Sequence, residues 1–168
     1  PYLYEGDIGY ERDYLAAYAA SPRSVFVLAF DKGEVVGAST GIPLAEDAPA
    51  FQQPFHDRGI DIDRVFYFGE SVLLHRYRGR GLGHGFFDHR EAHARALDGF
   101  SFTAFAAVDR DHDDPRRPPN HRGNEAFWIK RGYTRQTGMT MHLDWNELER
   151  GEIDHALTFW TRPLEDRA

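Results

Sequence analysis

The chain has 168 residues, of which 41% are hydrophobic and 14% aromatic. This composition predicts a folded chain rather than a disordered one, and the length suits a single domain, residues 1–168, that buries a substantial core. The formal net charge of −7 argues against general binding to nucleic acid and agrees with a cationic substrate. Because the chain contains no cysteine, disulfides, thiolate metal sites and a cysteine nucleophile are excluded.

The sequence gives a general expectation for the location of the protein and leaves its oligomeric state open. No apolar run approaches the length of about 18 residues that spans a membrane, and no signal peptide is visible. We therefore expect a soluble, cytoplasmic protein without a membrane partner, and homodimer formation stays open. The sequence opens on Pro1 instead of an initiator methionine, so we expect residues upstream of it to be missing.

The first 63 residues predict a helix, a hairpin and a loop. Apolar and aromatic residues at helical spacing indicate a helix over residues 10–20, which a Ser-Pro pair ends. Residues 25–31 and 34–40 have the pattern of antiparallel strands joined by a turn at Lys32-Gly33. Residues 43–63 contain three prolines and are predicted to form a loop or a weak helix.

The rest of the chain predicts the centre of a sheet and its second half. An apolar run over residues 65–74 indicates a buried strand, which passes through a glycine-rich turn into an amphipathic helix over residues 82–97. The remaining elements follow in order: a strand over 100–108, a proline-rich loop over 109–123, a helix over 124–131 with Gly132 at its C-terminus, and strands over 133–143 and 156–162.

Three alternating glycines, Gly79, Gly81 and Gly83, form the turn between that central strand and its helix. Such a turn leaves the first N–H groups of the helix unpaired, and the positive end of the helix dipole adds to them, so phosphate oxygens fit there. The alternative is an ordinary strand-to-helix connection without a ligand. The dinucleotide fingerprint G-x-G-x-x-G fails, because its sixth position falls on His84 or Phe86, and the Walker P-loop spacing is absent.

The segment from Arg78 to Gly83 fits the pattern Arg/Gln-x-x-Gly-x-Gly/Ala and closely follows a strand that reads E-S-V-L-L. It resembles the acetyl-CoA motif of the GNAT superfamily of N-acetyltransferases. Lys130-Arg131-Gly132-Tyr133 is similar to a second element of that family, K-x-G-F/Y. The resemblance covers about residues 25–145 and implies an α/β (α+β) fold, in which a mixed central sheet is flanked by helices and two central parallel strands splay apart. The first strand of the family has no counterpart here.

The resemblance also implies acetyl-CoA as the cosubstrate, because in this family its pantetheine arm lies between the splayed strands. By position, Val72, Leu73 and Leu74 would contact the arm, and Asn124 either binds the pantetheine or points to solvent. The turn would bind the diphosphate, and the implied residues are Arg78, Gly79, Arg80, Gly81, Leu82, Gly83 and His84. For the two arginines, solvated positions beside the turn are the alternative to pairing with phosphate.

Glu70 is the candidate general base. Counting in twos places Phe66, Phe68, Glu70, Val72 and Leu74 on one face of the strand, and a carboxylate on an otherwise apolar face is typical of a functional position. Burial there would raise its pKa towards the range useful for taking a proton, and many family members carry a strand glutamate at this point. A structural role in an arginine pair is the alternative, and a bulge in the strand would break the counting.

The general acid and the acceptor pocket are less well defined. The family often carries a tyrosine where this chain has Trp128, which we expect to pack because an indole cannot deliver a proton. The remaining candidates for the general acid are water, Tyr67 and Tyr133. For the acceptor pocket, Tyr4 is the expected substrate-binding residue, with Tyr2 and Glu5 beside it, and packing at the start of a helix is their alternative role.

No metal site is predicted. His89 and His93 lie one helical turn apart, but the zincin motif requires glutamate where this chain has Arg90, and residues 111–114 suit a solvated loop. Two functions follow. The first is an N-acetyltransferase that moves acetyl from acetyl-CoA to a primary amine of a small molecule or peptide by direct attack. The second is a non-catalytic CoA-binding module of the same fold. A nucleotide-binding domain is a third option, which the glycine spacing disfavours.

Overall fold

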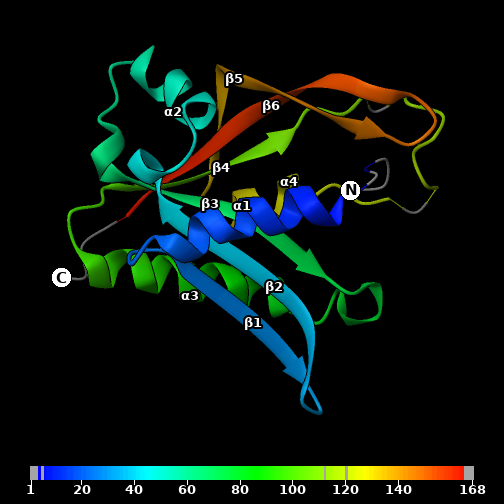
Figure 1. Cartoon of the computed structure of the whole chain (residues 1–168), viewed down its shortest axis with the longest axis horizontal. Helices are drawn as coiled ribbons and strands as arrows, with labels where there is room; N and C mark the ends of the chain where they lie inside the picture. Colours follow the sequence, from blue (N-terminus) through cyan, green and yellow to red (C-terminus); the bar gives the residue numbers. More distant parts are fainter. Residues whose placement is uncertain (1–3, 5, 112, 120, 165–168) are drawn as a thin grey trace.

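The computed structural model describes residue 4 and residues 6–111, 113–119 and 121–164. Six strands form one mixed sheet in the order β1-β2-β3-β4-β6-β5, in which β3 and β4 are parallel and the other neighbours antiparallel (Figure 1). The strands are β1 (Val25–Asp31), β2 (Glu34–Pro43), β3 (Val65–Leu73), β4 (Phe102–Val108), β5 (Thr134–Glu147) and β6 (Gly151–Pro163). The helices are α1 (Ile8–Ala20), α2 (Pro49–His56), α3 (Leu82–Leu97) and α4 (Glu125–Lys130). The predicted fold class, a mixed sheet flanked by helices, is confirmed.

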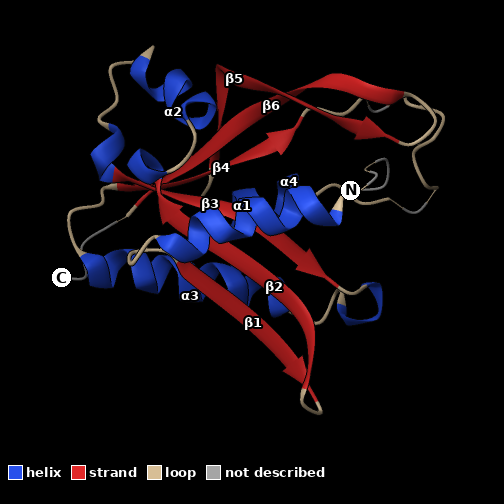
Figure 2. Ribbon diagram, viewed as in Figure 1, coloured by secondary structure: helices blue, strands red, loops and turns tan. Residues whose placement is uncertain are grey.

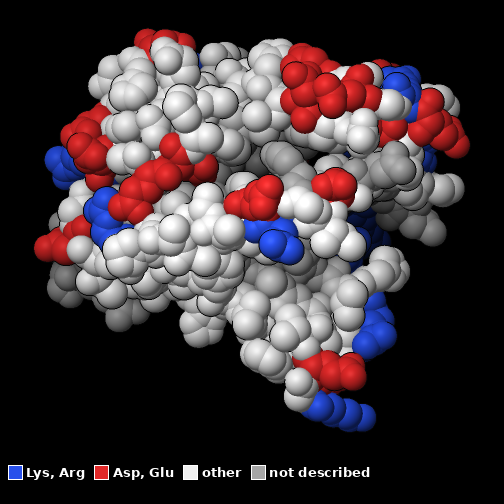
Figure 3. Space-filling view, viewed as in Figure 1, with Lys and Arg blue, Asp and Glu red and all other residues white. Residues whose placement is uncertain are grey.

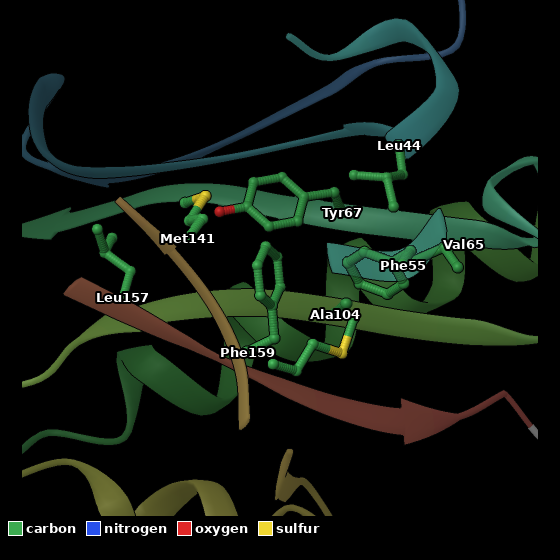
Figure 4. Close-up of a cluster of buried hydrophobic side chains, with 9 residues drawn as sticks. Leu44, Phe55, Val65, Tyr67, Ala104, Met141, Leu157 and Phe159 are labelled. Carbon is green, nitrogen blue, oxygen red and sulfur yellow. The ribbon is translucent and has the colours of Figure 1, made fainter. Parts of the chain in front are cut away.

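Helices cover both faces of the sheet. Figure 2 shows α1 crossing one face, with α3 on the opposite side. The core divides accordingly into two clusters of buried side chains. One contains Phe55 of α2 with Tyr67 and Phe159 of the sheet (Figure 4), and the other contains Phe66 of the sheet with Phe87 of α3. Successive residues of β3 therefore enter different clusters, as the period of two in a strand requires. None of the helices in the described residues has the length and apolar character needed to cross a lipid bilayer.

The C-terminal hairpin is longer than the sequence predicted. β5 and β6 remain paired out to Glu147 and Gly151. Partly buried residues such as Trp145 and its cross-strand partner Ile153 alternate here with exposed charged residues, and those charges concealed the strand pattern in the sequence. The tip of the hairpin lies against the segment before α1, because Tyr4 forms a β-bridge with Glu147.

The two parallel strands pair over only three residues. Val65–Tyr67 of β3 pairs with Phe102–Ala104 of β4, after which both strands continue without pairing to each other, and Figure 1 shows them diverging. The Tyr67 hydroxyl lies where they separate, since it accepts a hydrogen bond from the backbone N–H of Ala106. The Tyr67 hydroxyl thus takes the hydrogen bond of a backbone N–H that would otherwise pair with a neighbouring strand. The splayed central strands that the family resemblance implied are present.

Candidate active site

The turn between β3 and α3 leaves the start of α3 open. Gly79 and Gly81 have φ of +75° and +83°, a conformation that other residues rarely adopt, and a Cβ built on either would meet no atom within 4 Å. Gly81 is the N-cap of α3, and no side chain of the described residues hydrogen-bonds to that cap. The N–H groups of Leu82 and Gly83 have no hydrogen-bond partner among the described residues, whereas that of His84 donates to the carbonyl oxygen of Gly81 at 3.0 Å. Two open amides at the start of α3 meet the condition that an anion site at a helix N-terminus requires.

The two arginines of the turn lie at the surface. Arg78 Nε donates to the carbonyl oxygen of Leu73 at 3.1 Å, which ties the turn to the end of β3. The Arg80 guanidinium lies 5.3 Å from the ring centroid of Tyr77, whose hydroxyl donates to Asp31 at 2.6 Å. Both side chains are held by neutral groups, so their positive charges are not neutralised by these contacts. Pairing of either arginine with a phosphate stays a prediction.

Glu70 lies on a β-bulge of β3. Between the pairs Ser39–Ser71 and Gly41–Phe68, two steps along β2 oppose three steps along β3, so β3 carries one extra residue there. Two successive residues of a bulge point to the same side, after which the alternation of the strand continues out of phase. Counting in twos from the buried half of the strand therefore fails beyond this point.

The bulge turns Glu70 away from the predicted face. The expectation that Glu70 shares a face with Phe68 is wrong, because its carboxylate acts electrostatically on Tyr14 and Tyr67, which lie on the face that α1 covers. The Glu70 N–H donates to the hydroxyl of Thr40 on β2 at 3.0 Å, and this bond stabilises the bulge. Glu70 consequently faces α1, on the opposite side of the sheet from α3.

A second carboxylate, Glu11 of α1, lies near Glu70. Although Glu70 remains in contact with solvent, burial by the surrounding chain raises the pKa of its carboxyl group, and the negative charge of Glu11 raises it further. The Tyr4 hydroxyl donates to Glu11. No arginine or lysine of the described residues pairs with Glu70, so the alternative of a structural ion pair has no support. A carboxyl with a raised pKa and no arginine or lysine partner in the described part of the chain suits a group that accepts a proton.

The predicted arm-binding segment runs along the free edge of β3. Val72 and Leu73 pair with β2 on one edge, while the edge that faces β4 is unpaired in the described structure. The side chains of Val72 and Leu74 are 52% and 48% exposed. A free strand edge beside exposed apolar side chains can bind an extended amide chain of the pantetheine type. The contacts themselves stay a prediction.

The residues after the 109–123 loop take three different positions. Trp128 packs against Phe105 and Trp160, with ring centroids 4.9 and 5.2 Å away, so its predicted packing role is confirmed. Tyr133 is 2% exposed and bonded within the core, and burial raises its pKa, so it is a poor proton donor. Asn124 is the exposed N-cap of α4, and its side chain makes no capping bond. Its contact with pantetheine is untested.

Tyr4 lies between α1 and the β5–β6 hairpin, and its binding of the substrate stays a prediction. Besides its bond to Glu11, its ring lies edge-on to Trp145 of β5, with centroids 6.4 Å apart. Its neighbours Tyr2 and Glu5, also predicted to line the pocket, lie outside the described residues. Tyr4 therefore connects α1 with the β5–β6 hairpin on the face where Glu70 lies.

Helix α1 contributes side chains to the site that were not among the predicted site residues. Glu11, Tyr14 and Tyr18 recur at helical spacing and face the sheet, where the Tyr18 hydroxyl donates to Asp47 at 2.9 Å. The Tyr14 hydroxyl would lie only 2.4 Å from a Cβ on Gly69, so the glycine of the bulge allows α1 to approach. The helical spacing of this carboxylate and the two tyrosines could be read from the sequence, but the strand against which they pack could not.

The histidine pair of α3 and the acidic loop show no metal site. His93 Nε2 lies 2.9 Å from the carbonyl oxygen of Arg23, and His89 is exposed. Asp114 pairs with Arg116 at 2.7 Å, and residue 112 lies outside the described part. Within the described ranges, no three histidine or carboxylate side chains gather as ligands of one ion.

Solved structures with the same fold are acetyltransferases. No family model matches the sequence, and no curated protein does. An aminoglycoside 6'-N-acetyltransferase complexed with coenzyme A is 17% identical, with a TM-score of 0.61 over 97% of this chain and 83% of that one. A GCN5-related N-acetyltransferase from Kribbella flavida is 19% identical, with a TM-score of 0.59 over 96% and 82%. A ribosomal-protein-alanine N-acetyltransferase from Brucella melitensis is 13% identical, with a TM-score of 0.58 over 94% and 79%. At these identities the similarity shows the fold.

Proposed function

We propose that this chain, which has the fold of the GNAT acetyltransferases, is an N-acetyltransferase that moves acetyl from acetyl-CoA to a primary amine. One observation carries the proposal. β3 and β4 stop pairing after Tyr67, and the free edge of β3 leads from the bulge at Glu70 to the uncapped start of α3. A base, a site for the extended arm of the thioester and a site for the diphosphate thus follow one another along β3 and the turn after it.

The chain can hold acetyl-CoA with groups that the structure leaves available. The open amides between Gly79 and Gly83 suit the diphosphate, since an added Cβ at Gly79 or Gly81 would occupy otherwise empty space there. Arg78 and Arg80 add positive charge beside them. When bound, acetyl-CoA supplies an acetyl group activated as a thioester. The N–H and C=O groups on the edge of β3 that does not pair with β4, apart from the Leu73 carbonyl that Arg78 occupies, then serve to orient the arm.

Glu70 acts as the general base for the acceptor amine. Attack by the amine nitrogen forms the C–N bond of the amide while the C–S bond breaks and the sulfur leaves as a thiolate. The proton lost from the nitrogen passes to Glu70, directly or through one water molecule. The raised pKa of Glu70 brings its carboxylate closer in basicity to the amine. Tyr67 and Tyr133 are both buried in the core, and burial raises the pKa of each, so we assign the thiolate no protein proton donor.

The surface around the site favours a cationic acceptor. Figure 3 shows acidic side chains on both the α1 side and the β5–β6 hairpin side of this face. The exposed carboxylates of α1, of the segment before it and of the hairpin are Asp7, Asp13, Asp144, Glu149, Glu152 and Asp154, of which Asp144, Glu152 and Asp154 lie on the strand face opposite Trp145 and His155. Their combined negative potential attracts an ammonium group and raises its local concentration. The similar structures include an aminoglycoside and a ribosomal-protein acetyltransferase, so either a small molecule or a peptide amine fits the proposal.

A non-catalytic CoA-binding module is the second candidate, because Trp128 occupies the position where the family often has a tyrosine. The two functions differ in thiol release.

We expect the purified chain with acetyl-CoA to release free thiol when spermidine, D-glucosamine or an alanine-terminated peptide is added. Glu70→Gln should lower kcat/KM at least about 100-fold while CoA binding is retained. Glu34→Gln, an exposed change at the β1–β2 turn, is the matched control. CoA binding in calorimetry, with no thiol release from any amine, would contradict the enzyme and support the module.

A further inference from the structure

The tip of the β5–β6 hairpin contains buried polar atoms that the fold does not explain. His155 Nε2, Trp145 Nε1 and Arg116 Nη1 are each buried and have no hydrogen-bond partner among the described residues. His155 as a whole is only 7% exposed. Leaving one such atom without a partner costs about 1–3 kcal/mol, so three at one hairpin tip indicate that a polar partner other than the chain, water or a ligand, binds there.

These atoms belong to one small cluster. The rings of Trp145 and His155 are stacked, with centroids 3.7 Å apart and planes 4° apart. Arg116 Nη2 lies 3.0 Å from Glu147 Oε1, two residues along β5 from Trp145 on the same strand face. Glu147 is itself 2% exposed. The 109–123 loop thereby places a guanidinium against Glu147, on the strand face that carries Trp145, and the cluster combines a loop with both strands of the hairpin.

The chemistry of the cluster selects its ligand. Burial, and then the positive charge of Arg110, lower the pKa of His155, so the imidazole is neutral at pH 7. Its bond to the backbone of Trp145 takes the Nδ1 proton, which leaves Nε2 as a hydrogen-bond acceptor. Trp145 Nε1 and Arg116 Nη1, in contrast, are donors. A carboxylate can only accept, so it has no hydrogen to offer to the lone pair of His155 Nε2. An ammonium can only donate, so it cannot bond to the N–H groups of Trp145 and Arg116. A hydroxyl group both donates and accepts.

The cluster is connected to the candidate base through Tyr4 and Glu11. The Tyr4 ring contacts Trp145, and the Tyr4 hydroxyl donates to Glu11, whose charge acts on Glu70. Figure 1 shows the tip of the hairpin on the side of the molecule where α1 begins. Tyr4 therefore connects the cluster with the carboxylates of Glu11 and Glu70, which an acceptor that spans the two would approach from the Tyr4 side.

We propose that His155, Trp145 and Arg116 form a subsite that binds a hydroxyl group of the acceptor, so that the enzyme prefers a hydroxylated amine to a plain alkyl amine. The hydroxyl donates to His155 Nε2 and accepts from Trp145 Nε1 or Arg116 Nη1. This inference rests on the proposed acetyltransferase function. It adds the acceptor class and a specificity-determining residue, His155.

The test compares D-glucosamine with cyclohexylamine, which share a six-membered ring and an amine but differ in hydroxyl groups. His155→Phe keeps a flat ring on Trp145 and removes the acceptor nitrogen. The measured quantity is kcat/KM for glucosamine divided by kcat/KM for cyclohexylamine. We expect His155→Phe to lower this ratio about tenfold, because one hydrogen bond at the upper end of its usual energy range corresponds to about that factor. His155→Gln, which restores an acceptor, should recover part of the ratio. His142→Phe, an exposed histidine of the same hairpin, is the control and should leave the ratio unchanged.

Tryptophan fluorescence gives a readout that does not depend on turnover. Glucosamine should change the emission of the wild-type chain saturably, with a dissociation constant that rises about tenfold in His155→Phe, and Trp145→Phe should abolish most of the change. If His155→Phe reduces both amines equally, or if glucosamine leaves the emission unaltered, the cluster holds ordered water only and the inference is overturned. Glucosamine binding that depends on His155 without any thiol release would instead retain the subsite and refute the acetyltransferase function.

Discussion

Replacing Gly81 with alanine separates the cost of a strained backbone from the loss of a phosphate site. Gly81 has φ of +83°, and a Cβ there would meet no protein atom within 4 Å, so strain is the whole expected cost to folding. A left-handed conformation costs an alanine roughly 1–2 kcal/mol. For a domain of this size, that lowers Tm by roughly 2–8 °C. Gly33 in the β1–β2 turn has φ of +87° and equally empty surroundings, so Gly33→Ala should cost the same.

The two variants should differ only in CoA binding. At Gly81 the new methyl group fills the space in front of the first amides of α3, whereas Gly33 lies in a different turn of the sheet. Loss of even one amide bond to a charged phosphate, about 1.5–3 kcal/mol, weakens binding roughly 10-fold to 150-fold. Isothermal titration calorimetry with CoA measures this, and differential scanning calorimetry measures Tm. If Gly81→Ala binds CoA as tightly as Gly33→Ala does, the diphosphate does not bind at this helix start and our reasoning is refuted.

Three further predictions concern the base, the diverging strands and the core. Because the folded chain raises the pKa of Glu70, ionisation of this carboxyl opposes folding. Glu70→Gln should therefore raise Tm at pH 8, by an increment that disappears below about pH 4. An increment in Tm that is the same at both pH values would contradict this. Tyr67→Phe leaves the Ala106 N–H without its partner and should destabilise the fold by about 1–3 kcal/mol in urea unfolding, with weaker CoA binding. Glu91→Gln removes a buried carboxylate that contacts three guanidinium groups and should cost about 3 kcal/mol. Asp88→Asn, at a 63% exposed carboxylate that contacts one of those guanidinium groups, should cost less than about 1 kcal/mol, and equal losses would argue against burial as the cause.

Local patterns in the sequence predicted most of the fold. The helix of residues 82–97 and the strand of residues 25–31 have the predicted ends, because each follows from a periodic run bounded by glycine or a charged turn. β5 and β6 were predicted too short. Their outer halves pair residues such as Asp144 and Asp154, whose charges point to solvent, and only the pairing itself shows that the alternation continues.

The site could be predicted only in part, and Glu70 shows why. Its identity as a carboxylate within an apolar strand was visible in the sequence, but its direction was not. The bulge beside it depends on the register between β2 and β3, a contact between segments about thirty residues apart. The proximity of Glu11 and the cluster around His155 depend in the same way on how α1 and the hairpin pack against the sheet.

By itself the sequence determined the strand, the glycine turn and the helix, since backbone conformation and periodicity are set by residues that are neighbours in the chain. Only the tertiary structure decided where β3 parts from β4, which face Glu70 occupies and which buried polar atoms gather at the hairpin tip. Each of these depends on hydrogen bonds and packing between distant segments, whose register no local pattern specifies.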